Sequence, residues 1–378
     1  MVPGCVEVSV FRQALKKVPE GLGYALLLFV ATRAALMLIG LISHDAFGGR
    51  DLSEFPRWFD MWNVWDSNWY IDIAKNGYST ATNSVNMANY AFFPLYPMAM
   101  RLAAALIGDY FAAGLAISNV CLIIACVYLY KLVRLDDDER TARRAIKYLF
   151  LFPTAFIFSG VFTESTFLAL SLACFYYARR GRWHYSGVLG FLTALTRPYG
   201  VIIALPMAYE YLRSKDFRLG DVRPDALLLS LPLIGLSLFC LYNYCLTGDP
   251  LAFMHIQSAW GGRLSNPAVE LLGRLASHSG DVRFEALFTL ASLALLAACF
   301  KKIDISYLAY GLLLILIPLS TPNSTWSMAR YILVVFPVFI ILAKIGENRD
   351  LDQAMTIVLA MFQGLLMALW TIWSYYII

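Results

Sequence analysis

Long apolar runs recur along the whole chain and leave few folds open to it. A helix needs about 20 consecutive residues to cross the hydrocarbon core of a bilayer, and a shorter one can tilt or sit beside thinned lipid. The composition agrees with a bilayer setting, because 60% of the residues are hydrophobic, 15% are charged and the mean hydropathy is +0.62. The runs cover residues 22–42, 111–134, 146–162, 164–179, 185–212, 225–247, 285–300, 305–320, 328–343 and 354–377.

One of these runs, 185–212, is too long for a single ordinary span and carries its own interruption. In the stretch TRPYG, Pro198 lacks a backbone donor and Gly200 loosens the helix. We therefore predict two short helices that form a hairpin. Together with the other runs this gives about eleven membrane segments. No repeat or duplication into halves is visible, which indicates one all-α, polytopic helical domain over residues 1–378.

The distribution of basic residues predicts which ends of the helices face the cytoplasm. If residues 1–21 lie inside and each run crosses the membrane, the inner segments hold 20 of the 30 Lys and Arg residues and the outer loops hold eight. Arg33 and Arg197 then lie within the membrane. Residues 1–21 are too polar for the core of a signal peptide, so the first run is expected to remain as a helix. The conspicuous outer regions are 43–110, 248–284 and 320–331.

The first outer region mixes acids and aromatic rings in the stretch NVWDSNWYIDIAKNGY. We expect a short amphipathic helix that ends at Asn76-Gly77. Its i, i+4, i+7 spacing puts Asp66 on the same face as Trp62, Trp69 and Tyr70. Asp66 has two interpretations. Spacing alone favours a helix N-cap, worth roughly 1 kcal/mol, and the alternative is a catalytic base in an aromatic pocket that binds a sugar ring.

Two neighbouring acids and the segment that follows complete this region. Asp60 and Asp72 are each six residues from Asp66, about 120° around the helix, so we expect them to point elsewhere. In the stretch YAFFPLYPMAMRLAAALIG, two prolines forbid a regular span. We predict a bent element followed by a short helix in the plane of the membrane interface.

The motifs and their order resemble the PIG-V family, which comprises GPI mannosyltransferase II and prokaryotic relatives within the GT-C glycosyltransferase superfamily. The resemblance extends over nearly the whole chain. Its more specific part is WDSNWYIDIAKNGY followed by AFFPLYP. The later motifs are individually weaker, and they are FTESTFLAL, LTRPYG, QSAW and SMARYILVVFPVF.

The resemblance implies an integral-membrane enzyme of GT-C type with its active site on the non-cytoplasmic face. Such enzymes take a sugar, typically mannose, from a polyprenyl monophosphate and invert its anomeric carbon. The catalytic Asp of the Trp-Asp motif would be Asp66, and Trp65, Trp69 and Tyr70 would contact the sugar or acceptor. TRPYG and SMARY depart from the pattern of other members, and the chain is shorter than typical eukaryotic ones. The acceptor, a glycolipid, glycan or protein, therefore stays open.

Four further residues are candidates for binding the donor or the acceptor. Glu164 either holds sugar hydroxyls or the acceptor, or is an acid favoured at a helix start capped by Thr163. An intramembrane Arg197 costs about 2.5–3.5 kcal/mol on insertion scales, so we expect it to bind a lipid phosphate, Glu164 or carbonyls freed by the helix break. Arg330 and Tyr331 either stabilise the departing polyprenyl phosphate or snorkel to the interface. The family resemblance favours phosphate binding.

The remaining polar residues are weaker candidates. Gln257, Trp260 and Arg263 are candidates for a lid over the acceptor, although a plain polar loop is the simpler explanation. Arg33 carries the same cost as other intramembrane arginines and is expected to pair with an acid or a backbone group. The cysteines and histidines lack metal-ligand spacing, so no metal or other cofactor is expected. The run DDDERTARR is typical of a solvated helix start.

The predicted function is a membrane glycosyltransferase that moves a hexose, mannose by the resemblance, onto an acceptor hydroxyl with Asp66 as the general base. A nucleotide is not expected, because the chain has no Gly-rich phosphate loop. Nucleic acid is an unlikely class of partner, because the net charge is only +4 and no basic block occurs. The alternative is a transporter or lipid flippase, which explains the intramembrane arginines and broken helices but predicts internal symmetry and short outer loops.

Overall fold

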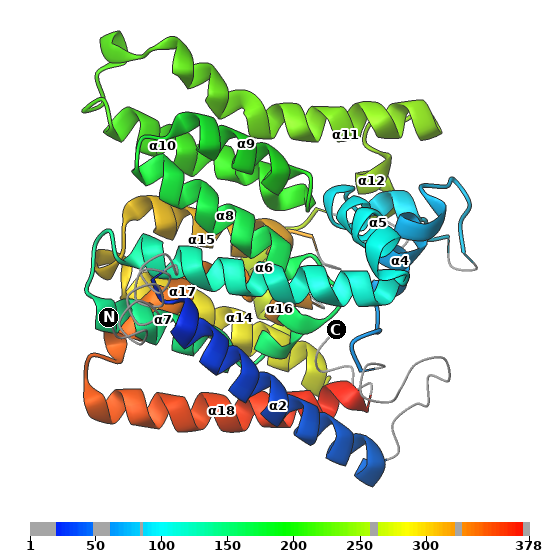
Figure 1. Cartoon of the computed structure of the whole chain (residues 1–378), viewed down its shortest axis with the longest axis vertical. Helices are drawn as coiled ribbons and strands as arrows, with labels where there is room; N and C mark the ends of the chain where they lie inside the picture. Colours follow the sequence, from blue (N-terminus) through cyan, green and yellow to red (C-terminus); the bar gives the residue numbers. More distant parts are fainter. Residues whose placement is uncertain (1–19, 48–60, 84–85, 258–263, 322–326, 373–378) are drawn as a thin grey trace, which may run out of the picture.

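The computed structural model describes residues 20–47, 61–83, 86–257, 264–321 and 327–372, and all regular secondary structure in these ranges is helical (Figure 1). The α-helices are α2 (Leu22–Phe47), α4 (Ser67–Asn76), α5 (Leu95–Ile107), α6 (Tyr110–Val133), α7 (Glu139–Leu151), α8 (Glu164–Arg179), α9 (Trp183–Ala194), α10 (Ala204–Arg213), α11 (Leu231–Thr247), α12 (Ala252–His255), α13 (Pro267–Leu275), α14 (Gly280–Ala298), α15 (Ile305–Leu319), α16 (Met328–Ile332), α17 (Phe336–Ile345) and α18 (Arg349–Thr371). The 3-10 segments are η1 (Asn89–Ala91), η2 (Ala155–Ser159), η3 (Pro198–Ile203), η4 (Leu219–Asp221), η5 (Pro224–Ser230) and η7 (Phe300–Lys302).

Four helical segments are long and apolar enough to cross a membrane, which supports a helical membrane protein. The estimate of about eleven membrane segments is not confirmed. The other helices in the described ranges are too short or not apolar enough to count as spans. The run 328–343 is not one span, since α16 ends at Ile332 and α17 begins at Phe336. Pro337 fits the first turn of a new helix, where its missing N–H costs nothing. The four segments are Leu22–Phe47, Tyr110–Val133, Pro224–Thr247 and Arg349–Thr371.

The turns with basic residues gather at one end of the bundle, which we call the basic end. Figure 1 shows the α6–α7 and α17–α18 connections there, and α4 and α5 at the opposite end. Arg179 pairs with Asp136 across this end at 2.6 Å. Asp138 caps α7 by accepting a hydrogen bond from the Thr141 amide at 2.8 Å. The run DDDERTARR is therefore a helix start, as predicted. The basic end comprises residues 134–138, 179–182, 213–218, 299–304 and 344–348.

Residues 152–163 join α7 to α8 without forming an α-helix, although all of them are buried. Backbone carbonyls in such a position must be paired, because water cannot reach them. Arg33 of α2 donates from Nη2 to the carbonyl of Ala155 at 3.1 Å, so the expected pairing of this arginine with a backbone group is confirmed. Gln363 of α18 donates to the carbonyl of Phe152 at 3.0 Å. Polar side chains of distant helices thus stabilise the broken segment.

The predicted break in the run 185–212 is confirmed. Helix α9 ends at Ala194, and α10 begins at Ala204 after the 3-10 segment η3. The two parts approach so closely that a Cβ on Gly200 would lie 2.1 Å from the carbonyl oxygen of Thr193. Glycine is required at this position because another backbone occupies the space of a side chain.

We expect Gly200→Ala to lower the stability of the protein. The clash is with backbone that cannot rotate away. We therefore expect the free energy of unfolding to fall by about 1–3 kcal/mol or more, as at other overpacked sites. Thermal unfolding of the detergent-solubilised protein measures it as a lower midpoint. Gly220→Ala is the control, because nothing lies within 4 Å of its Cβ position. Equal midpoints for the two variants would contradict the close approach.

Candidate functional site

The Trp-Asp motif lies in a turn with an uncommon backbone conformation. Trp65 has a φ of 54°, in the left-handed region that bulky residues rarely adopt. Such a conformation costs of order 1–3 kcal/mol and persists only where the surrounding structure enforces it. Asp66 follows directly and precedes α4. This helix ends at Asn76 before Gly77, whose φ is 85°, as the sequence predicts.

Asp66 occupies the N-cap position of α4, but its side chain makes no capping hydrogen bond. A capping side chain usually needs extended backbone, whereas Asp66 is helical, with φ −68° and ψ −12°. The N-cap interpretation of this side chain is therefore wrong. The carboxylate instead pairs with Arg330, whose Nη2 lies 2.7 Å from Oδ2. A charge-assisted bond of this kind is stronger than one to a neutral amide.

Contacts on its other faces hold α4 in place. Tyr70 is buried and meets the rings of Phe92 and Tyr96 edge to face, with centroid distances of 5.2 and 5.3 Å. Asp72 points away from Asp66, as predicted, and its Oδ2 accepts a hydrogen bond from Asn89 at 2.8 Å. The ring contacts of Tyr70 fix the helix that follows the motif and so limit where the Asp66 carboxylate can lie.

Two carboxylates and two guanidinium groups alternate in a chain of ion pairs, Asp66–Arg330–Glu164–Arg197, which we call the site cluster. Arg330 places Nε 3.1 Å from Oε1 of Glu164, and Nη2 of Arg197 lies 2.5 Å from the same oxygen. The exposed fraction of the side chain is 26% for Asp66, 12% for Arg330, 8% for Arg197 and 1% for Glu164. Glu164 is therefore the most deeply buried member of the cluster, and Asp66 is the most exposed.

Each member of the site cluster lies at or near the start of a helix. Asp66 precedes α4, Glu164 begins α8, Arg197 precedes η3, and Arg330 is in the five-residue α16. Of the three partners considered for Arg197, the structure shows Glu164. Thr163 makes no side-chain capping bond to α8, so its predicted role as a cap is wrong. The side chain of Glu164 forms ion pairs with two arginines, so the helix dipole alone does not explain its position.

Aromatic rings cover the arginines of the site cluster. The Tyr331 ring centroid lies 5.4 Å from the guanidinium carbon of Arg197 and 5.9 Å from that of Arg330. Burial raises the pKa of Tyr70, and the negative charge of Asp66 raises this pKa further. Tyr70 therefore keeps its proton at neutral pH, and its hydroxyl remains a hydrogen-bond donor beside the cluster.

The start of α8 carries buried polar atoms that have no hydrogen-bond partner among the described residues. They are Oε2 of Glu164 and the hydroxyl oxygen of Thr163. Buried polar atoms cost free energy unless a ligand or water binds them. In the same ranges, no group of three or more His, Cys, Asp and Glu residues is placed to hold a metal ion. The two arginines of the site cluster suit an anionic ligand.

The other residues predicted for the site differ in how the structure places them. Trp65 and Trp69 are both half-buried, and Trp69 stacks on Phe92 with centroids 5.7 Å apart. Gln257 is exposed just after α12 and is not a member of the site cluster. Trp260, like Arg263, lies outside the described residues. Of the predicted set, the acid and arginine members come together, and the proposed lid stays a prediction.

Sequence reasoning missed Glu285 of α14. This side chain is buried, and its Oε2 accepts a hydrogen bond from the amide of Ala329, the residue before Arg330, at 2.7 Å. An available signal was its place at the edge of the apolar run 285–300. Acids in such runs are costly to bury and usually have a specific partner.

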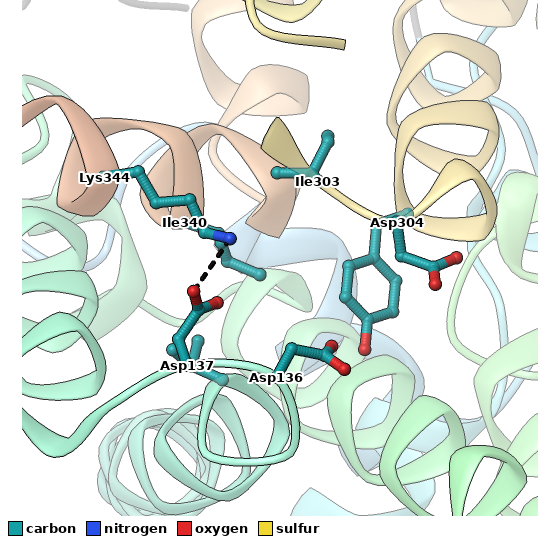
Figure 2. A pocket seen from close by; sticks show the side chains of 8 residues that line it. Asp136, Asp137, Ile303, Asp304, Ile340 and Lys344 are labelled. Atoms are coloured by element: carbon teal, nitrogen blue, oxygen red, sulfur yellow. Dashed lines mark ion pairs between the residues drawn. The ribbon is translucent and has the colours of Figure 1, made fainter. Parts of the chain in front are cut away.

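A second polar region lies at the basic end, around a small cavity (Figure 2). Lys344 pairs with Asp137 there at 2.9 Å. Arg179 pairs with Asp136 at 2.6 Å and lies 3.6 Å from Asp304. Because these acids already have cationic partners, the region ties α6, α8, α15 and α17 together. The cavity is lined by Val133, Asp136, Asp137, Ile303, Asp304, Tyr307, Ile340 and Lys344.

Comparison with protein families shows which family the chain belongs to. The model of the family described as Mannosyltransferase (PIG-V) matches residues 27–241, more than half of the chain. Helices that are long and apolar enough to cross a membrane agree with membership of this family. The chain belongs to the mannosyltransferase (PIG-V) family, which confirms the resemblance seen in the sequence. No match was found among curated proteins.

Solved structures of the Archaeoglobus fulgidus oligosaccharyltransferase are similar to the chain at 14% identity. The form tethered with an acceptor peptide gives a TM-score of 0.43 and covers 92% of this chain and 54% of that one. The complex with Zn and sulfate gives 0.45, with 89% and 53% covered. The complex with an inhibitory peptide and a dolichol-phosphate gives 0.42, with 92% and 55% covered. The chain spans about half the length of these structures.

Glu164→Gln is expected to destabilise the protein strongly, because two buried guanidinium groups would lose the carboxylate they share. Breaking a buried ion pair in this way costs about 3–5 kcal/mol. The double variant Glu164→Gln/Arg197→Gln removes one charge of each sign and should recover part of the loss. Thermal unfolding in detergent measures both effects.

The matched control for this experiment is Glu139→Gln. Glu139 pairs with Arg143 at 2.6 Å, but both side chains are exposed, so the change should have little effect. A midpoint for Glu164→Gln no lower than that of the control would show that the site cluster does not stabilise the fold.

Proposed function

We propose that this protein transfers mannose from a polyprenyl-phosphate-linked donor to an acceptor hydroxyl, with inversion at the anomeric carbon, as a GT-C-type enzyme. The observation that carries the proposal is the Asp66–Arg330 ion pair at the Trp-Asp motif of a chain in the mannosyltransferase family. This pair joins a proton acceptor to a phosphate-binding cation. Membership of an enzyme family favours transfer over the transporter alternative.

In the proposed reaction, the Asp66 carboxylate takes the proton of the acceptor hydroxyl as its oxygen attacks C1 of the sugar. The new bond from C1 to the acceptor oxygen forms while the bond from C1 to the phosphate oxygen breaks. The electron pair of that broken bond leaves with the polyprenyl monophosphate. Arg330 and Arg197 stabilise the charge that develops on this phosphate. Glu164 keeps the two guanidinium groups together.

The ion pair also brings the proposed base next to a proposed ligand of the donor phosphate. Arg330 engages one oxygen of the Asp66 carboxylate, Oδ2. A donor phosphate would offer Arg330 a competing anion.

The position of the site cluster supports a lipid-linked donor on the non-cytoplasmic face. The motif lies at the end of the bundle opposite the basic end (Figure 1), and the positive-inside rule assigns the basic end to the cytoplasm. Helix α5 follows the motif and exposes Leu102 and Leu106. Such an apolar face suits contact with membrane lipid or a prenyl chain.

Asp66→Asn is expected to reduce mannosyl transfer by at least about 10²-fold, because an amide cannot accept the proton. Binding of polyprenyl monophosphate should persist, since Arg330 and Arg197 remain. The assay uses purified protein in proteoliposomes with radiolabelled polyprenyl-phosphate-mannose and a membrane extract of the producing cells as the acceptor source. Mild acid releases label from unreacted donor, because a glycosyl phosphate is more labile than a glycoside.

The control for the base is Asp72→Asn, which changes an acid of the same helix that faces Asn89. This variant should transfer mannose at close to the wild-type rate. Equal turnover by wild type and Asp66→Asn would end the general-base proposal. Absence of transfer by the wild type from this donor would end the proposal of a polyprenyl-phosphate-mannose substrate.

A further inference from the structure

Buried side chains bond both backbone groups of Ala329, the residue before Arg330. Oε2 of Glu285 accepts a hydrogen bond from the amide of Ala329 at 2.7 Å. The hydroxyl of Thr154 donates to the carbonyl of the same residue at 3.1 Å. The exposed fractions are 3% for Glu285, 0% for Thr154 and 1% for Ala329. Both backbone groups of the residue before Arg330 are therefore bonded away from water.

Helix α16 needs such support because it is too short to hold its own direction. It has five residues, and its N-cap Ser327 makes no side-chain capping bond. The first amides of a helix have no partner within it, and isolated helices this short are unstable. The chain then breaks again before α17 begins at Phe336. Neither end of α16 therefore fixes where the Arg330 side chain points.

We propose that Glu285 and Thr154 are positioning residues that orient Arg330 through the backbone of Ala329. The inference rests on the proposed role of Arg330 toward the donor phosphate. Glu285 comes from α14 and Thr154 from the segment between α7 and α8, so the two clamp α16 between elements that are far apart in sequence. Arg330 is thereby held within reach of both Asp66 and Glu164.

Glu285 acts through hydrogen bonding rather than by touching substrate. Its side chain is buried, and the partner it contacts is a backbone amide. Its second oxygen, Oε1, has no hydrogen-bond partner among the described residues. A glutamine offers the same carbonyl acceptor to Ala329, whereas a leucine of similar size offers none. Comparison of these two substitutions separates the hydrogen bond from the packing.

The test compares Glu285→Gln with Glu285→Leu, and Thr154→Ser with Thr154→Val. Because misplacement by about 1 Å can cost 10²-fold in rate, Glu285→Leu should lower kcat/KM for the polyprenyl-phosphate-mannose donor by about 10–100-fold. Glu285→Gln should stay within about threefold of wild type, since the acceptor is kept. Thr154→Val should also lower kcat/KM, whereas Thr154→Ser, which keeps the hydroxyl donor, should stay close to wild type. Binding of polyprenyl monophosphate should weaken in the leucine and valine variants.

Amide hydrogen exchange gives a readout that needs no substrate. Peptides that contain Ala329 should exchange faster in Glu285→Leu than in wild type. Glu285→Gln should keep the wild-type protection of the Ala329 amide. Ser292→Ala is the matched control. Ser292 is a buried residue of α14 two turns from Glu285, and its hydroxyl donates to the carbonyl of Phe288 in the same helix. This variant should leave both exchange at Ala329 and donor turnover unchanged.

The outcomes separate this inference from the proposed function. Equal loss in Glu285→Gln and Glu285→Leu would overturn it, because charge rather than the hydrogen bond would then matter. Wild-type turnover and exchange in Glu285→Leu and Thr154→Val would also overturn it. If Glu285→Leu does not fold, the Thr154 pair alone decides between the outcomes. Protection at Ala329 without any turnover by wild type would instead count against the proposed donor and leave the clamp supported.

Discussion

A buried carboxylate shared by two guanidinium groups is the interaction on which this site depends. Glu164 is 1% exposed and pairs with both Arg197 and Arg330. None of these charges can be left alone in such surroundings without a large cost in free energy, so each fixes the position of the others. Asp66 joins the chain of ion pairs at its accessible edge. The arrangement that stabilises the fold thus presents one carboxylate to solvent and keeps two cations behind it.

Broken helices make this arrangement possible. Arg197 and Arg330 lie at helix starts that would not exist if the runs 185–212 and 328–343 continued as regular spans. The breaks expose backbone groups, and distant polar side chains bond them, as Arg33 does for Ala155 and Gln363 for Phe152. Glu285 and Thr154 do the same for Ala329. Intramembrane polar residues in this protein therefore serve two purposes, the charged cluster and the backbone around it.

Many site residues could be predicted because they interrupt an apolar pattern. Glu164 was one of three partners considered for Arg197, since an intramembrane charge requires a partner. The N-cap interpretation of Asp66 failed because spacing describes one helix, while Arg330 reaches it from a remote segment. The single span over 328–343 failed because hydropathy does not register a backbone break. Glu285 was missed although its acid lies at the edge of an apolar run.

The order of residues is enough to establish a helical membrane protein, a bias of basic residues toward one set of turns and the mannosyltransferase family. These properties follow from local hydropathy, charge and motif, which spacing along the chain records. Three-dimensional packing was needed to show which carboxylate oxygen meets which guanidinium and that α16 is clamped at Ala329. Ion pairs and buried hydrogen bonds depend on distances between elements remote in sequence, and on burial that neighbouring helices create. Spacing along the chain contains neither quantity.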